Sequence, residues 1–149
     1  MHPRNPDFRS KLEHIFGKAP FISELGVQVT DCGAGWCETS LLVQPKHYQQ
    51  DTFVHAGVQS TMADHTAGGA AGTLIGPDET ILTANFFINL LRPAIGTRLR
   101  CKATVLKPGK TLIVVESEVY TGTEHHEKLT AKATVTLAVI KLTSLSAST

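Results

Sequence analysis

The feature that most limits how this chain can fold is a helix-length run of small residues at positions 56–74. Ala, Gly, Thr and Val dominate this run. Its interior glycines, Gly68, Gly69 and Gly72, each cost a helix about 1 kcal/mol relative to Ala. Close approach of another backbone would compensate for this cost, and a ligand lying along the helix is the alternative. The run therefore predicts a helix with a sheet wrapped tightly around it.

Asp64 is the only charged residue in this run. A carboxylate inside a helix competes for nearby backbone groups, and small apolar neighbours strip it of water. An acid placed in this way is a candidate general base or nucleophile. A structural acid, bonded to a nearby hydroxyl or facing water beside His65, is the alternative. Gly57, one residue past Ala56 at the expected helix start, would leave backbone N–H groups free to bind a developing oxyanion.

Composition narrows the class of protein. The 149 residues fit one domain, 1–149, with a full-sized core. The net charge of +1 and the dispersed basic residues argue against a nucleic-acid partner. No apolar run approaches the roughly 20 residues of a membrane span, and residues 1–7 lack the apolar core of a signal peptide.

The three cysteines, Cys32, Cys37 and Cys101, are an odd number and too few for a disulfide scaffold. We therefore expect a reduced, cytoplasmic protein in which these residues fill the core.

Periodicity and turn residues predict the remaining elements. An amphipathic helix is expected near 7–17, with Asp7 near its start, and a helical turn at 19–25. The long helix should end near Gly76-Pro77. Alternating segments predict strands at residues 26–31, 36–43, 81–91, 97–106, 111–120 and 129–142. A loop should occupy 44–55, and the polar tail 143–149 is expected to be disordered.

The strand expected at 81–91 shows the alternation clearly. Leu82 and Phe86 would lie on an apolar face, and Thr83 and Asn85 on the opposite one. Such alternation is typical of antiparallel strands with one buried face. The order of two strands, a long helix and four strands predicts an α+β fold, with one buried helix against a six-stranded antiparallel sheet.

Several motifs occur in the order and at the spacing that are typical of a known protein family. His55-Ala56-Gly57 opens the helix, Gln49 precedes His55 by six residues, and Asp64 follows it by nine. A strand ends in Arg-Pro-Ala at residue 94, and the hairpin 107–110 follows. Over about residues 20–141 the chain resembles hotdog-fold acyl-CoA thioesterases, in particular the PaaI-like, phenylacetate-pathway branch. The resemblance implies a central helix wrapped by a six-stranded sheet.

The resemblance also implies a mechanism. Asp64 would attack the thioester carbonyl or activate a water, and the N–H of Ala56, helped by Gly57, would polarise the carbonyl oxygen. Gln49 would position the water or the thioester, and His55 would hold the loop through a hydrogen bond. Family members pair their sheets as homodimers or homotetramers, with each site at a subunit interface. No metal and no cofactor are implied beyond the coenzyme A of the substrate.

Two departures from the family pattern leave alternatives open. Ala56 replaces the middle glycine of His-Gly-Gly, although a backbone donor survives the change. Gly68 stands where some members carry a hydroxyl, and Thr83 matches the strand hydroxyl of others; a plain strand residue is the alternative for Thr83. A non-catalytic acyl-CoA-binding or regulatory module is therefore the second hypothesis for function, and a hotdog dehydratase or hydratase the third.

Other polar residues are weaker candidates. Arg92, Lys107 and Lys110 could receive the phosphates of coenzyme A, although scattered surface cations are common. Gln50 could replace Gln49 if the loop register shifts by one residue. His65 is expected to be a surface or packing residue.

Overall fold

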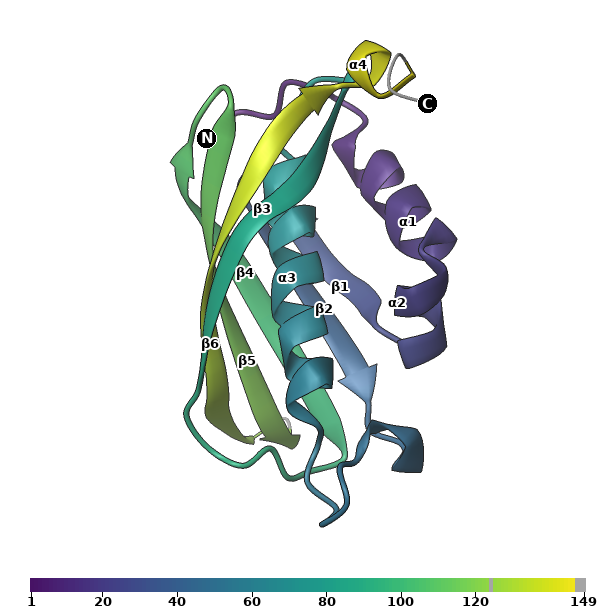
Figure 1. The fold of residues 1–149 in the computed structure, drawn as a ribbon, viewed down its shortest axis with the longest axis vertical. Coiled ribbons are helices and arrows are strands. Elements are labelled where there is room, and N and C mark those ends of the chain that lie inside the picture. Colours follow the sequence, from purple (N-terminus) through teal and green to yellow (C-terminus); the bar gives the residue numbers. More distant parts are fainter. Residues whose placement is uncertain (124, 147–149) are drawn as a thin grey trace.

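The computed structural model describes residues 1–123 and 125–146. One antiparallel sheet of six strands curves around the long helix α3 (Ala56–Gly72), as Figure 1 shows. The helices α1 (Phe8–Lys18) and α2 (Pro20–Leu25) lie on the other side of α3 from strands β3 and β6. The α+β architecture expected from the sequence is confirmed.

The strands follow one another in the sheet in the order β1-β2-β4-β5-β6-β3, so that β1 and β3 form its edges. Their bounds are β1 (Gln28–Gly33), β2 (Trp36–Leu42), β3 (Glu79–Leu90), β4 (Arg98–Pro108), β5 (Leu112–Thr123) and β6 (His126–Lys141). None of the helices in residues 1–123 and 125–146 is long and apolar enough to cross a membrane.

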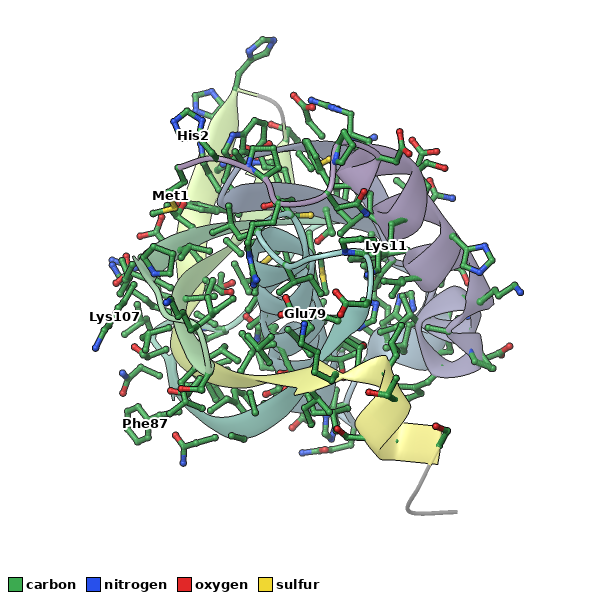
Figure 2. All side chains as sticks on the ribbon, turned by 90° about the horizontal axis from the view of Figure 1, so that it is seen from above. Met1, His2, Lys11, Glu79, Phe87 and Lys107 are labelled. Atoms are coloured by element: carbon green, nitrogen blue, oxygen red, sulfur yellow. The ribbon has the colours of Figure 1, made fainter. Side chains whose placement is uncertain are left out.

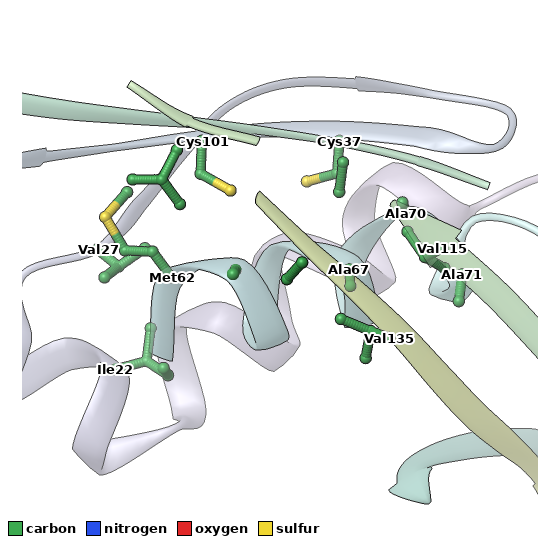
Figure 3. Packing of buried hydrophobic residues seen from close by; sticks show 14 of the residues in the cluster. Ile22, Val27, Cys37, Met62, Ala67, Ala70, Ala71, Cys101, Val115 and Val135 are labelled. Carbon is green, nitrogen blue, oxygen red and sulfur yellow. The ribbon is translucent and has the colours of Figure 1, made fainter. Parts of the chain in front are cut away.

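The small residues of α3 allow the sheet to approach it closely. Ala67, Ala70 and Ala71 are completely buried, and Figure 3 shows them among the side chains of the sheet. A Cβ on Gly69 would lie 2.8 Å from the Sγ of Cys37 on β2. The close approach predicted for the helix glycines is therefore real at Gly69, although side chains rather than a backbone make the contact.

Helix α3 ends at Gly72, earlier than the Gly76-Pro77 stop that the sequence suggested. The Thr73 hydroxyl donates to the Ala70 carbonyl at 2.7 Å and accepts from the Gly35 N–H at 2.8 Å. This residue therefore closes the helix and ties its end to the β1–β2 turn.

The two ends of the chain differ from expectation. Asp7 occupies the N-cap position of α1, but its side chain makes no capping hydrogen bond. The tail expected to be disordered forms a short helix, α4 (Leu142–Ser146), and residues 147–149 lie outside the described part of the chain.

A 3-10 helix, η1 (Pro45–His47), occupies part of the segment expected to be a plain loop.

Strand β3 does not alternate in the way the sequence suggested. Its pairing with β6 shifts register between Thr83 and Asn85, which is the signature of a β-bulge. Thr83 pairs with Leu137 and Phe86 with Val135. Both partners on β6 are buried, so Thr83 and Phe86 lie on the same face of the sheet, toward α3. The prediction that Thr83 and Phe86 lie on opposite faces of the strand was wrong, because the extra residue of the bulge shifts the alternation of side chains by one position.

Candidate active site

The carboxylate of Asp64 and the hydroxyl of Thr83 meet between α3 and β3. Thr83 Oγ1 donates a hydrogen bond of 2.7 Å to Asp64 Oδ1. Asp64 is half-buried, and Thr83 belongs to the face of β3 that points toward the helix. Because a carboxylate that accepts a hydroxyl hydrogen bond is held in one orientation, this pair can present its second oxygen to a reacting group.

A cavity of about 190 Å³ borders this pair and lies between α1, α3 and β3. Gly68 and His65 line it from α3, Phe16 from α1 and Ile81 from β3. A Cβ on Gly68 would meet nothing closer than 3.9 Å, so this glycine faces open space rather than a neighbouring element. The cavity can therefore hold an apolar group whose reactive end lies at Asp64.

His65 packs as expected and also lines this cavity. Its ring makes an edge-to-face contact with Phe16, with the ring centroids 4.3 Å apart. Burial lowers the pKa of the His65 imidazole, and the neighbouring carboxylate of Asp64 opposes that shift. The ring is therefore neutral at neutral pH and adds no charge to the cavity wall.

The start of α3 holds one backbone donor without an acceptor. The His55 side chain caps the helix, since its Nδ1 accepts from the Gly57 N–H at 2.8 Å. The Gly57 amide is thus engaged, which corrects the expectation that it is free for an oxyanion. Within residues 1–123 and 125–146, the N–H of Ala56 has no acceptor. Ala56 remains the donor available at the positive end of the helix.

The loop before the helix fixes Gln49 in place. The backbone N–H of Gln49 donates to the Phe53 carbonyl at 2.8 Å, and its side-chain Oε1 accepts from the N–H of Asp51. Gln50 is exposed, donates to the Asp51 carboxylate at 3.1 Å and does not line the cavity beside Ala56. The structure therefore favours Gln49 over Gln50 as the site residue.

His47 supports this loop and was missed by sequence reasoning. Its ring is buried; Nδ1 accepts from the Gln44 N–H at 2.9 Å, and Nε2 lies 2.8 Å from the Leu25 carbonyl. Its own carbonyl accepts from the His55 N–H at 2.8 Å. The spacing of Gln44 and His47 around Pro45, which forms a reciprocal capping box, was the available signal.

A second cavity, of about 420 Å³, lies beside the helix start. Gln49, Ala56 and Arg92 line it, together with Gln59, which the sequence had not suggested. Thus the candidate amide donor and the candidate positioning residue Gln49 share one space. Asp64 does not line that space.

One chain does not bring the acid and the amide donor together. Ala56 and Asp64 are eight residues apart on one helix, which corresponds to about 12 Å along its axis. A thioester carbonyl polarised by Ala56 is therefore out of reach of the Asp64 carboxylate of the same chain.

The three side chains considered as ligands for the phosphates of coenzyme A lie in different parts of the molecule. Arg92 lines the cavity beside Ala56 and donates to the Leu129 carbonyl at 2.9 Å. Lys110 lines a different cavity, together with Glu79. Figure 2 shows Lys107 pointing outward from the molecule. Arg92 lies just after the end of β3, whereas Lys110 shares its cavity with Glu79, the first residue of that strand, so these two cations do not line one space within a chain.

Among residues 1–123 and 125–146, no group of three or more His, Cys, Asp or Glu side chains could hold a metal ion. The cysteines are free and buried, as expected of core residues. Burial raises the pKa of the Cys101 thiol to about 12, and hydrogen bonding to Thr66 opposes this.

Comparison with known proteins gives the family. Residues 52–128 match the model of the thioesterase superfamily. A thioesterase family protein of Silicibacter pomeroyi is 32% identical, with a TM-score of 0.87 over 90% of this chain and 98% of that chain. The PaaI protein of E. coli, from the phenylacetic acid degradation operon, shares the fold with a TM-score of 0.80 and 16% identity, over 92% of this chain and 96% of that chain.

For one relative, the name also specifies a substrate. The 1,4-dihydroxy-2-naphthoyl-CoA hydrolase of Listeria monocytogenes is 27% identical over 117 residues, which is 78% of this chain and 93% of the relative. These matches favour a hydrolase over the non-catalytic module considered from the sequence. The chain belongs to the thioesterase superfamily and is a thioester hydrolase with the hotdog fold.

Proposed function

We propose that the protein hydrolyses the thioester of an acyl- or aryl-acyl-CoA to the free acid and CoA, with Asp64 as general base or nucleophile. The observation that supports this most is the pair formed by Asp64 and Thr83 at the border of an apolar cavity. A carboxylate held by a hydroxyl beside an apolar space suits attack on the carbonyl of an acyl group lying in that space.

The other residues take supporting roles in this proposal. The N–H of Ala56 polarises the thioester oxygen, where the helix dipole stabilises the developing negative charge. His55 fixes this turn by accepting from Gly57, and Gln49 positions the water or the thioester. Asp64 either attacks the carbonyl carbon directly or takes a proton from the attacking water.

The separation of about 12 Å between Ala56 and Asp64 requires a second copy of the chain. Strand β3 is an edge strand with exposed Phe86 and Phe87, which is a template for pairing with another strand. A two-fold axis beside β3 continues the sheet and places the two α3 helices antiparallel. The Asp64 carboxylate of one copy then faces the Ala56 amide of the other, and each dimer holds two sites.

The nature of the acyl group is part of the proposal. The Listeria relative is described as acting on an aryl-CoA, and the 190 Å³ cavity is larger than an engineered apolar cavity of about 150 Å³ that binds benzene. A single aromatic ring or a short aliphatic chain is therefore the group that we expect between α1 and α3.

The test is release of free thiol, followed with DTNB, from short-, medium- and long-chain, phenylacetyl and hydroxybenzoyl CoA esters. Wild-type protein should release thiol, whereas Asp64→Asn and Asp64→Ala should lose activity by about a thousandfold or more and remain folded. Asp31→Asn, an exposed acid on β1, is the matched control. Equal turnover by wild type and the Asp64 variants would refute the proposed role of this acid.

A further inference from the structure

Gln59 carries a buried polar group that the fold does not use. Its side chain is 3% exposed, and within residues 1–123 and 125–146 its Oε1 has no hydrogen-bond partner. Buried polar atoms are almost always paired, because leaving one unpaired destabilises the folded state. A carboxamide retained in this position therefore suggests a partner from outside the chain.

The position of Gln59 indicates where that partner lies. Gln59 follows Ala56 by three residues, so both occupy one face of α3. Side chains of a helix lean toward its N-terminus, which places the carboxamide over the first turn. Gln59 and Ala56 line the same cavity of about 420 Å³. The unpaired group thus lies beside the amide that polarises the thioester in our proposed function.

We propose that Gln59 is a specificity-determining residue that hydrogen-bonds the amide closest to the sulfur in a pantetheine thioester. The inference rests on the proposed function, in which Ala56 holds the thioester oxygen. From that oxygen, the first N–H donor along the leaving group follows the sulfur and two methylenes. This N–H is the hydrogen-bond donor that Gln59 Oε1 lacks within the described part of the chain. Coenzyme A and the prosthetic group of an acyl-carrier protein both contain this amide.

Apolar surroundings give the contact its selectivity. Phe53, Leu91 and Pro93 line the cavity with Gln59, and Arg92 already donates to the Leu129 carbonyl. A leaving group without an amide would enter this space and leave the carboxamide unpaired. Because an unmade hydrogen bond in a desolvated site discriminates strongly, the enzyme should prefer thioesters that carry the amide.

The experiment combines two substitutions of Gln59 with one change in the leaving group of the substrate. Wild type, Gln59→Met and Gln59→Leu are assayed on two thioesters of the same acid, one of N-acetylcysteamine and one of an alkanethiol of equal length. Wild type should favour the amide substrate by about 10- to 100-fold in kcat/KM. Both variants should lose about that factor with N-acetylcysteamine and almost nothing with the alkanethiol. Gln28→Met, at an exposed position on β1, should match wild type.

Stability separates this role from a structural one. Methionine fills the same space without an unpaired polar atom, so Gln59→Met should melt at the same temperature as wild type or higher. An equal loss of activity on both thioesters would overturn the inference, since it would indicate contact with the attacking water or damage to the fold. Unchanged activity on both thioesters would overturn it as well.

A binding measurement keeps this inference separate from the proposed function. Calorimetry with a non-hydrolysable alkyl thioether of coenzyme A should show about 10-fold weaker binding to Gln59→Met than to wild type. If wild type binds the thioether and hydrolyses no thioester, the proposed function fails while the Gln59 contact stands. Parallel assays with acyl-CoA and an acylated carrier protein identify which carrier is used, and the loss in Gln59→Met must appear with that carrier.

Discussion

Thr83 on β3 holds the carboxylate of Asp64 on α3 through a hydrogen bond of 2.7 Å. The bond exists because a β-bulge after Thr83 lets both this residue and Phe86 face the helix. Bulges commonly re-aim a side chain beside an active site. The pair therefore joins the central helix to the edge strand at the point where we place the chemistry.

Thr83→Val should lower kcat while leaving KM nearly unchanged. Valine keeps the shape of threonine, but it removes a charge-assisted hydrogen bond worth about 1.5–3 kcal/mol, which corresponds to about 10- to 100-fold in kcat. Steady-state kinetics on the best CoA ester measure this loss. Thr104→Val, at an exposed position on β4, is the matched control and should behave as wild type. A rise in KM at constant kcat would contradict the role of orienting the acid.

Ala56→Pro should remove the oxyanion donor without removing the helix. Proline lacks the backbone N–H but is favoured at the first helical position. The preceding His55 has φ of −59° and ψ of 139°, which a residue before proline adopts readily. We expect circular dichroism like that of wild type and a loss in kcat of about 100- to 1,000-fold.

Mixing two inactive variants tests whether each site needs two chains. When Ala56→Pro and Asp64→Asn subunits are unfolded together and refolded, half of the dimers should combine one of each. Each mixed dimer then has one intact site, so activity should return to about a quarter of the wild-type value. No recovery, with mixed dimers demonstrated by mass spectrometry, would refute a site shared between subunits.

Much of this arrangement could be predicted from local sequence. The small residues of α3 predicted a wrapped helix because only small side chains permit an approach such as that of Cys37 to Gly69. Asp64 was identified because a lone charge in an apolar helix is costly. Thr83 was a candidate only through the resemblance, and the structure places it in contact with the acid.

Two of the features that sequence reasoning missed, the bulge in β3 and the burial of Gln59, depend on contacts between distant segments. The bulge in β3 follows from pairing with β6, and no local pattern reveals it. The hydrogen bond from the Gly57 N–H to His55 Nδ1 is local, and it depends on how the His55 side chain is oriented. Gln59 resembles an ordinary polar helix residue until the fold buries it. Strand pairing and burial, which involve distant segments, therefore decide the bulge in β3 and the environment of Gln59.

Substitutions of two adjacent glycines on α3 should have opposite effects. Gly68→Ala should stabilise the protein by roughly 1 kcal/mol, because alanine favours helix and the new Cβ meets nothing closer than 3.9 Å. Gly69→Ala should destabilise by about 1–3 kcal/mol, since its Cβ would lie 2.8 Å from Cys37 Sγ. Urea unfolding measures both. Gly68→Ala should also slow hydrolysis of the bulkiest acyl groups, because its methyl enters the cavity.

Glu79 should make the protein sensitive to acid. The N–H of Gly76 lowers the pKa of this buried carboxyl, with help from Lys141 and Arg4 and against the effect of burial. A carboxyl whose pKa is lower in the folded state stabilises that state above its unfolded value of 4.5, and the contribution disappears as pH falls below that value. Near neutral pH, the free energy of unfolding of Glu79→Gln should therefore be lower than that of wild type by roughly 1–3 kcal/mol.

The difference should shrink steadily as the pH falls below 4.5, because protonated Glu79 and glutamine then carry the same charge. Thermal melts of wild type and Glu79→Gln between about pH 3 and pH 7 follow this convergence. Glu13→Gln, an exposed change on α1, corrects for the loss of one negative charge. A constant gap between the two curves across this range would show that packing, rather than ionisation, accounts for the stabilisation by Glu79.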